Sequence, residues 1–292
     1  MKKTALYLIL STWLVSCTKP IDYTIPNPGE KLVVQCILFN DVQTVAAISS
    51  SRHSLSSRSP FLLSGAKAVL IENGSRVDSF NEAQNVLSYY HIARMPVEGA
   101  SYTIKISAPN TPHLAPIEAK TTMPYEANPY ATRIDLSTHT ASFYLNDSAH
   151  TTDYYRIRVL DHPRDDNGYF FATTQPEMEI FNAYPDIFGD GRATGESAFI
   201  SDRSFNGRQK KFTVHLSVNE EDAGDQQYFL EVLRVNEDFY KYEKSLAASD
   251  ITGENPFQEP IQVFSNVENG YGILLAGARS LTTMEFFYSS PE

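Results

Sequence analysis

The chain has 292 residues and carries 24 Lys and Arg against 35 Asp and Glu, a formal net charge of −11. Hydrophobic residues make up 42% of the sequence, which is enough to build packed cores and excludes a globally disordered chain. The acidic balance argues against nucleic-acid binding, because phosphate recognition needs a basic surface. With only two cysteines, a disulfide-rich scaffold is also excluded.

Residues 1–16 have the features of a secretory signal peptide. Lys2 and Lys3 form a positive start, and the mostly apolar run 5–15 is too short, at about 1.5 Å per residue, to span a membrane. The run ends in Leu14-Val15-Ser16-Cys17, which resembles a bacterial lipobox. We therefore expect cleavage before Cys17 and lipidation of its thiol. The mature net charge would change from −11 to −13, because Lys2 and Lys3 are lost.

Residues 17–30 are expected to form a short extended tether between the lipid and the folded part. Pro20, Pro26 and Pro28 discourage regular structure in this segment. The second cysteine, Cys36, lies in the apolar run KLVVQCILF and is expected to be a small buried hydrophobic residue.

The segment 31–124 is predicted to form an immunoglobulin-like or fibronectin-like β-sandwich. Its apolar and polar residues alternate in short runs separated by turn residues, and Asn73-Gly74 is a strong hairpin signal. The predicted strands cover residues 31–39, 44–48, 66–72, 76–80, 86–92, 101–107 and 117–122.

The segment 125–292 is predicted to form a second β-sandwich or barrel-like domain with one helix. The helix covers 237–248, with Asn236 as its cap and Phe239, Tyr242 and Leu246 on one face. The predicted strands cover residues 132–136, 141–145, 154–160, 169–173, 212–218, 228–235, 261–265, 273–276 and 283–288.

Several short motifs carry a family resemblance. Gly99-Ala100-Ser101-Tyr102 enters a predicted strand, and residues 202–207 read Asp-Arg-Ser-Phe-Asn-Gly. The most specific motif is a loop near the C-terminus, whose characteristic residues are Pro256, Phe257, Pro260, Asn266, Asn269, Gly270 and Gly272. With the lipobox, these motifs resemble the domain of unknown function 4249 family, a set of Bacteroidetes outer-membrane lipoproteins. Its genes often lie beside those of TonB-dependent receptors, so the resemblance implies an outer-membrane role linked to uptake.

The residues of this motif loop also suggest a structural role. Asn269-Gly270 is suited to a tight turn, because both residues tolerate a positive φ. Gly272 precedes an apolar predicted strand, where the missing side chain permits close backbone approach. Contact with a ligand is the alternative interpretation of the same residues.

The sequence contains no recognised catalytic motif. None of the seven histidines forms a metal-binding pair at helical spacing, and neither G-x-S-x-G nor a phosphate-binding glycine loop occurs. Two acidic loops, 161–168 and 186–191, raise a calcium hypothesis, but neither follows the order of an EF-hand. We therefore expect no catalytic residues, no cofactor and no metal.

The function that the sequence favours is a non-enzymatic, lipid-anchored binding or accessory subunit beside a TonB-dependent outer-membrane receptor. The sequence does not decide whether the protein faces the periplasm or the cell surface. One alternative is a cell-envelope hydrolase acting on glycan or peptide, which would need a concave pocket with converging carboxylates or histidines. The other is a structural or adhesive surface lipoprotein.

Overall fold

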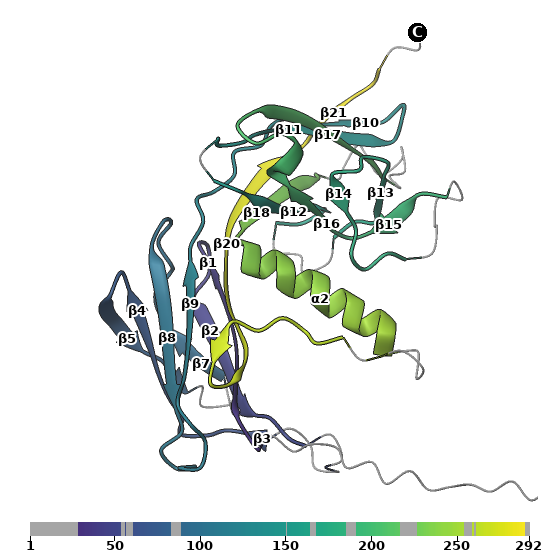
Figure 1. Ribbon diagram of the computed structural model, residues 1–292. Coiled ribbons are helices and arrows are strands. Elements are labelled where there is room, and N and C mark those ends of the chain that lie inside the picture. Colours follow the sequence, from purple (N-terminus) through teal and green to yellow (C-terminus); the bar gives the residue numbers. More distant parts are fainter. Residues whose placement is uncertain are drawn as a thin grey trace, which may run out of the picture.

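The structure is a computed structural model that describes residues 29–53, 56, 61–82, 89–149, 151–163, 168–184, 191–216, 227–253, 259 and 261–289. The predicted signal peptide, Cys17 and the tether up to residue 28 lie outside this part. Within it the chain is mostly β, with three sheets and one α-helix, and this confirms the predicted fold class (Figure 1). None of the described helices is long and apolar enough to cross a membrane.

A ten-stranded sheet runs through the whole folded part of the molecule. In spatial order its strands are β14 (Met178–Glu179), β16 (Ala198–Ser201), β12 (Tyr154–Leu160), β18 (Phe229–Val235), β20 (Tyr271–Thr283), β1 (Leu32–Phe39), β2 (Thr44–Ser50), β7 (Tyr89–Ile92) and β6 (Asn81–Glu82), and β3 (Phe61–Leu62) pairs with β2.

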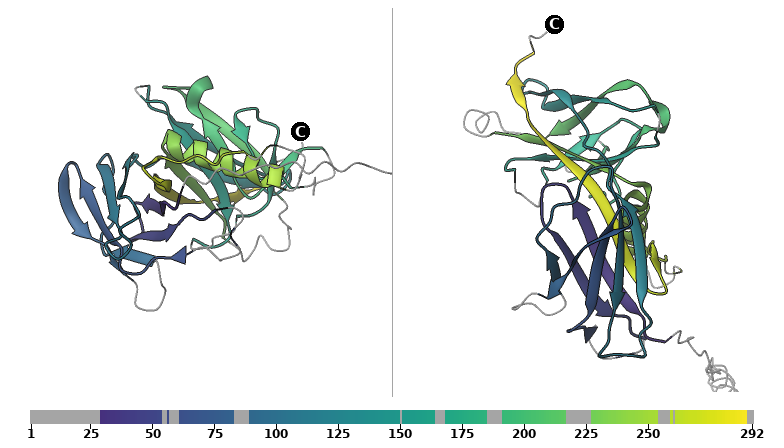
Figure 2. Two further views of the ribbon diagram at one scale, coloured as in Figure 1. Left: turned by 60° about the horizontal axis from the view of Figure 1, so that its bottom comes forward. Right: turned by 90° about the vertical axis from the view of Figure 1, so that its left-hand side faces the viewer.

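Two smaller sheets pack against different parts of this long sheet. The five-stranded sheet has the order β19 (Val267–Glu268), β9 (Ile117–Thr122), β8 (Ser101–Ser107), β4 (Lys67–Glu72) and β5 (Ser75–Ser79). The six-stranded sheet has the order β15 (Ala193–Gly195), β13 (Phe171–Thr173), β17 (Gln209–Leu216), β11 (Thr140–Asn146), β10 (Tyr130–Asp135) and β21 (Glu285–Phe287). Figure 2 shows the two smaller sheets at different ends of the long strand β20.

The first core lies between the five-stranded sheet and the strands around β1. Burial alternates along β1, so that Leu32, Val34, Cys36 and Leu38 all point into this core. Cys36 is 1% exposed, which confirms the predicted buried role. Burial raises the pKa of its thiol to about 12, so it holds no reactive thiolate at neutral pH.

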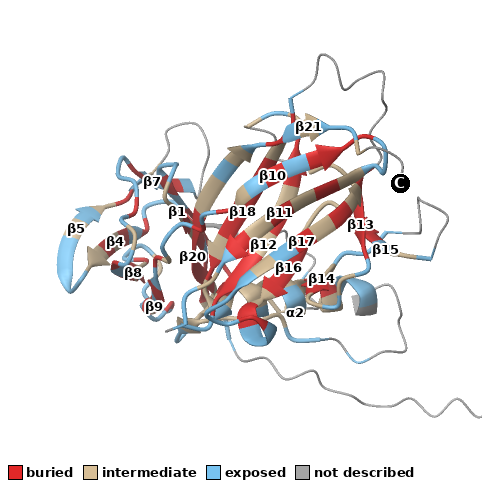
Figure 3. Cartoon of the chain, turned by 90° about the horizontal axis from the view of Figure 1, so that it is seen from above, coloured by how far each residue is buried: buried red, intermediate tan, exposed pale blue. Residues whose placement is uncertain are grey.

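The second core lies between the six-stranded sheet and β12, β16 and β18. Phe143 and Phe212 stack there, facing Ile157 and Val232 of the long sheet. Along β11 and the second half of β17, buried residues alternate with half-buried ones (Figure 3), because one face of these strands packs on this core.

The helix α2 (Glu237–Gly253) packs on the opposite face of the long sheet. Its start is capped as predicted, because the Asn236 Oδ1 accepts a hydrogen bond from the Phe239 N–H at 3.0 Å. Phe239 is buried with Leu233 of β18 and Leu275 of β20. Tyr242 packs at the edge of the same cluster.

The strand β20 belongs to both sandwiches. Residues Tyr271–Gly277 pair in parallel with β1, and Gly277–Thr283 pair antiparallel with β18. Its alternate residues Leu274, Ala276 and Ala278 lie in the first core. The long sheet therefore contains strands from both sides of residue 124, the domain boundary that the sequence suggests. The strand β20, near the C-terminus, completes the N-terminal sandwich.

One predicted strand is wrong. Residues 261–265 are irregular instead, and the Phe264 N–H donates to the Ser245 Oγ of α2 at 2.8 Å. Burial does not alternate along this segment, because residues 261 and 262 are exposed and residues 263–265 are half-buried. By contrast, the structure places β8, β9 and β12 at the predicted bounds.

A buried carboxylate links the strands where the two sandwiches meet. Glu231 of β18 is 1% exposed and accepts hydrogen bonds from Arg158 at 2.7 and 2.9 Å and from Arg279 at 2.6 Å. Arg156 lies 3.4 Å away. Burial opposes ionisation of Glu231, but the hydrogen bond from Arg158 and the charges of the three arginines outweigh it and lower its pKa to about 2. Arg279 also forms an ion pair with Asp41 in the β1–β2 turn, at 3.1 Å.

We expect Glu231→Gln to lower the free energy of unfolding by about 3–5 kcal/mol, because three guanidinium groups would lose their shared carboxylate. The folded pKa lies below the ordinary value of about 4.3, so this stabilisation is fully present above about pH 4.3 and lost as the pH falls toward 2. Urea unfolding followed by circular dichroism across this range measures both effects.

The matched control is Glu285→Gln, at an exposed position of β21. It should change the free energy of unfolding by less than about 0.5 kcal/mol. If the free energy of unfolding changed with pH in the same way for the wild type and Glu231→Gln, the stabilising role of this carboxylate would be wrong.

Candidate functional site

Asn269 and Gly270 of the C-terminal motif lie in the turn between β19 of the five-stranded sheet and β20 of the ten-stranded sheet. Asn269 has a φ of +62° and is followed by Gly270 in the turn. Gly272 has a φ of +108°, and a Cβ built on it would lie 1.8 Å from the Val34 carbonyl oxygen. Only glycine therefore fits where β20 begins to pair with β1.

Asn266 acts as a substitute for a neighbouring strand. Its Oδ1 accepts a hydrogen bond from the Leu274 N–H and its Nδ2 donates to the Leu274 carbonyl, both at 2.9 Å. At Leu274 the strand β18 does not yet pair with β20. The same Nδ2 lies 3.1 Å from Asp238 of α2 and 3.4 Å from the Lys120 carbonyl of β9. One side chain thus joins β20, the helix and the five-stranded sheet.

The remaining predicted site residues cannot be placed. Pro256, Phe257 and Pro260 of the motif loop, and the lipidation residue Cys17, lie outside the described residues. The same holds for most of the second acidic loop and for residues 164–167 of the first.

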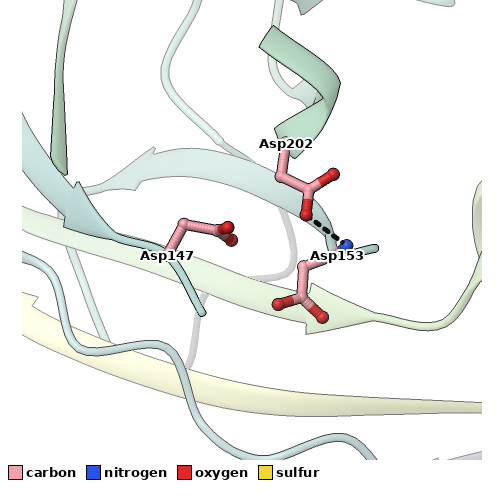
Figure 4. Close-up of side chains that lie close together, drawn as sticks. All are labelled: Asp147, Asp153 and Asp202. Atoms are coloured by element: carbon pink, nitrogen blue, oxygen red, sulfur yellow. Dashed lines mark hydrogen bonds between the residues drawn. The ribbon is translucent and has the colours of Figure 1, made fainter. Parts of the chain in front are cut away.

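Three aspartates converge where the β11–β12 connection meets the turn after β16. Asp147, Asp153 and Asp202 each place a carboxylate oxygen within 4.8 Å of the others. Figure 4 shows the side chain of Asp147 directed toward the other two, and the Asp153 N–H donating to the Asp202 Oδ2 at 2.8 Å. Carboxylates at this spacing are of the type that binds hard cations such as Ca²⁺.

Most of these carboxylate oxygens already have donors within the protein. Asp147 accepts from the Tyr155 hydroxyl at 2.7 Å and from the Gly207 N–H at 2.9 Å. Asp153 forms an ion pair with Arg234. These hydrogen bonds connect the 202–207 turn to the segment between β11 and β12.

Asp202 is the exception within the cluster. Its side chain is fully buried, and its Oδ1 has no hydrogen-bond partner among the described residues. Burial, together with the charges of Asp147 and Asp153, raises its pKa despite the hydrogen bond from the Asp153 backbone. Sequence reasoning noticed Asp202 in its motif but missed the cluster, because its members come from separate segments.

Two surface hollows lie elsewhere on the molecule. One, of about 770 Å³, crosses the five-stranded sheet and carries mixed charges from Lys67, Arg76, Lys105, Glu118 and Glu268. The other, of about 460 Å³, lies beside the start of α2. Neither is lined by the three aspartates, so the cluster does not open into either hollow.

A family model described as "Domain of unknown function (DUF4249)" matches residues 18–283. The chain belongs to the DUF4249 family. This match spans nearly all of the chain after Cys17, including both sandwiches and the motif loop. No curated protein matches the sequence.

Three solved structures that resemble this DUF4249 chain all have low TM-scores. A DUF4785 family protein from Legionella pneumophila is 12% identical, with a TM-score of 0.26 over 70% of this chain and 51% of the other. An α2-macroglobulin from Salmonella is 6% identical, with a TM-score of 0.22 over 89% of this chain and 15% of the other. The α2-macroglobulin from Escherichia coli is 9% identical, with a TM-score of 0.20 over 70% of this chain and 14% of the other.

We expect Asn266→Ala to lower the free energy of unfolding by about 2–4 kcal/mol, because it leaves the buried N–H and carbonyl of Leu274 without partners. Asn266→Asp should also destabilise, since a carboxylate cannot donate to the Leu274 carbonyl and would face Asp238. Chemical denaturation followed by circular dichroism measures both changes.

The control is Asn269→Gly in the turn between β19 and β20, where the positive φ is compatible with glycine. It should stay within about 0.5 kcal/mol of the wild type. If Asn266→Ala were as stable as this control, the strand-substituting role of Asn266 would be wrong.

Proposed function

We propose that this protein is a lipid-anchored, non-catalytic binding or accessory subunit that works beside a TonB-dependent receptor in the outer membrane. The observation that carries the proposal is the lipobox ending in Cys17, followed by a proline-containing segment that leads to the first core strand. Membership of the DUF4249 family adds support, since the family resemblance implies an outer-membrane role linked to uptake.

The tether gives the folded part a limited working distance from the lipid. Fully extended, the residues between Cys17 and Leu32 reach about 50 Å at roughly 3.5 Å per residue. The lipid would therefore keep the sandwiches close to the membrane surface while leaving them free to meet a receptor in the same membrane.

The folded part is suited to presenting a fixed surface. The two sandwiches share β20, and the Glu231 network ties β12, β18 and β20 to the β1–β2 turn. Loops held by such a framework keep a constant arrangement, which favours recognition of a large partner.

A hydrolase is less favoured by the described residues. The cluster of Asp147, Asp153 and Asp202 is engaged by Arg234, Tyr155 and backbone N–H groups, and neither hollow described above contains it. A catalytic pair of carboxylates would instead need access to substrate and water.

The test is affinity purification of the tagged full-length protein from detergent-solubilised outer membranes of its own host, with palmitate labelling of the same cells. We expect the wild type to incorporate label and to recover a TonB-dependent receptor at constant stoichiometry. Cys17→Ser should neither label nor recover the receptor, because it removes the lipid attachment point.

Cys36→Ser is the matched control, because its side chain is buried in the first core and has no part in lipid attachment. It should label like the wild type. Equal labelling of the wild type and Cys17→Ser would refute the anchor, and recovery of the wild type without any receptor would refute the accessory role.

A further inference from the structure

Three segments from different parts of the chain meet at the side chain of Asn40, where the two sandwiches join. Its Oδ1 accepts a hydrogen bond from the Arg279 N–H of β20 at 2.8 Å. Its Nδ2 donates to a carboxylate oxygen of Glu126 and lies 3.5 Å from one of Glu98. The β1–β2 turn, the turn before β8 and the connection between the sandwiches therefore form one continuous surface.

Large apolar side chains are exposed on all three of these segments. Val42 is 47% exposed, Val97 51% and Tyr125 62%. Tyr125 is held in place, because Met123 is buried in the first core and Ala127 in the second. It also lies against Gly99, where an added Cβ would come within 2.4 Å of its hydroxyl oxygen. Apolar groups fixed in an exposed position indicate an interaction surface.

Glu98 and Glu126 supply the negative charge of this surface. Glu98 and Glu126 have no Lys or Arg within salt-bridge distance in the described part of the chain. The nearby Arg279 is already bound to Glu231, Asp41 and the Pro163 carbonyl. Burial raises the pKa of Glu126, and the charge of Glu98 adds to this effect. A cation placed between the two carboxylates would relieve their repulsion.

We propose that Val42, Val97, Glu98, Tyr125 and Glu126, here called the junction patch, bind an arginine side chain of a protein partner. A guanidinium can stack on an aromatic ring and donate to carboxylates at the same time, which a compact ammonium does less well. The proposal rests on the proposed function, because the partner is the outer-membrane receptor. At about 3.3 Å per residue, the length of β1 places the patch roughly 25 Å from the end of the tether.

The test replaces Tyr125 with the photo-crosslinking residue p-benzoylphenylalanine in the full-length lipoprotein, illuminated in the membranes of its own host. We expect a covalent adduct with the receptor that co-purifies with the wild type, and a crosslinked peptide that contains or adjoins an arginine. The same crosslinker at Tyr288, which is 66% exposed beyond β21, should give no receptor adduct.

A charge test accompanies the crosslink. The double variant Glu98→Gln and Glu126→Gln keeps acceptors for the Asn40 amide but removes both charges, and should reduce the adduct by at least about tenfold. Glu285→Gln on β21 should leave it unchanged. An undiminished adduct in the double variant, or an adduct with a second copy of this chain or with lipid alone, would overturn the proposal.

The two proposals fail in different ways. If the receptor co-purifies with the wild type but Tyr125 gives no adduct to it, the junction patch is wrong and the accessory role stands. If the wild type recovers no receptor at all, the accessory role fails, and the patch proposal fails with it.

Discussion

The architecture depends on the pairing of one strand, β20, with partners on both of its sides. Its first half pairs with β1, from the start of the folded chain, and its second half pairs with β18. Each neighbour pairs with only about half of β20. On the side of each neighbour, the backbone N–H and carbonyl groups of the other half therefore lack a strand partner. Asn266 fills this position at Leu274, and Asn40 does the same at Arg279. Two asparagine side chains thus pair with backbone groups of β20 at positions where no neighbouring strand does so. Leaving these buried N–H and carbonyl groups unpaired would lower the stability of the fold.

This arrangement connects the family motif to the proposed interaction surface. The motif residues around Gly272 allow β20 to approach β1, and β1 leads directly to the turn that carries Asn40. From there the contacts run to Glu98 and Glu126 on one side and to Arg279 and Glu231 on the other. The described residues of the motif therefore lie at one end of β1 and the junction patch at the other.

Local patterns in the sequence were sufficient to locate most strands and the helix. Alternation in 101–107 and 154–160 gave the bounds of β8 and β12, and Asn236 identified the start of α2. The same logic failed at 261–265, where the segment pairs with no strand and the Phe264 N–H donates to Ser245 of α2 instead. Two-residue strands such as β14 and β19 are too short to leave a periodic signal.

Long-range relationships could not be predicted from one sequence. The parallel pairing of β1 with β20 joins residues more than 200 positions apart, and nothing local specifies it. The aspartate cluster and the junction patch likewise combine residues from separate segments of the chain. The anchor at Cys17, by contrast, is proposed directly from contiguous residues.

Native-state hydrogen exchange is the most direct test of the central role of β20. If the strand unites both sandwiches, the amides of Leu274, Gly277 and Arg279 should be among the slowest to exchange. They should open with the same free energy as core amides of β8 in the first sandwich and β11 in the second. Opening of β8 and β11 with clearly different free energies, with β20 following only one of them, would contradict a single cooperative unit built on this strand.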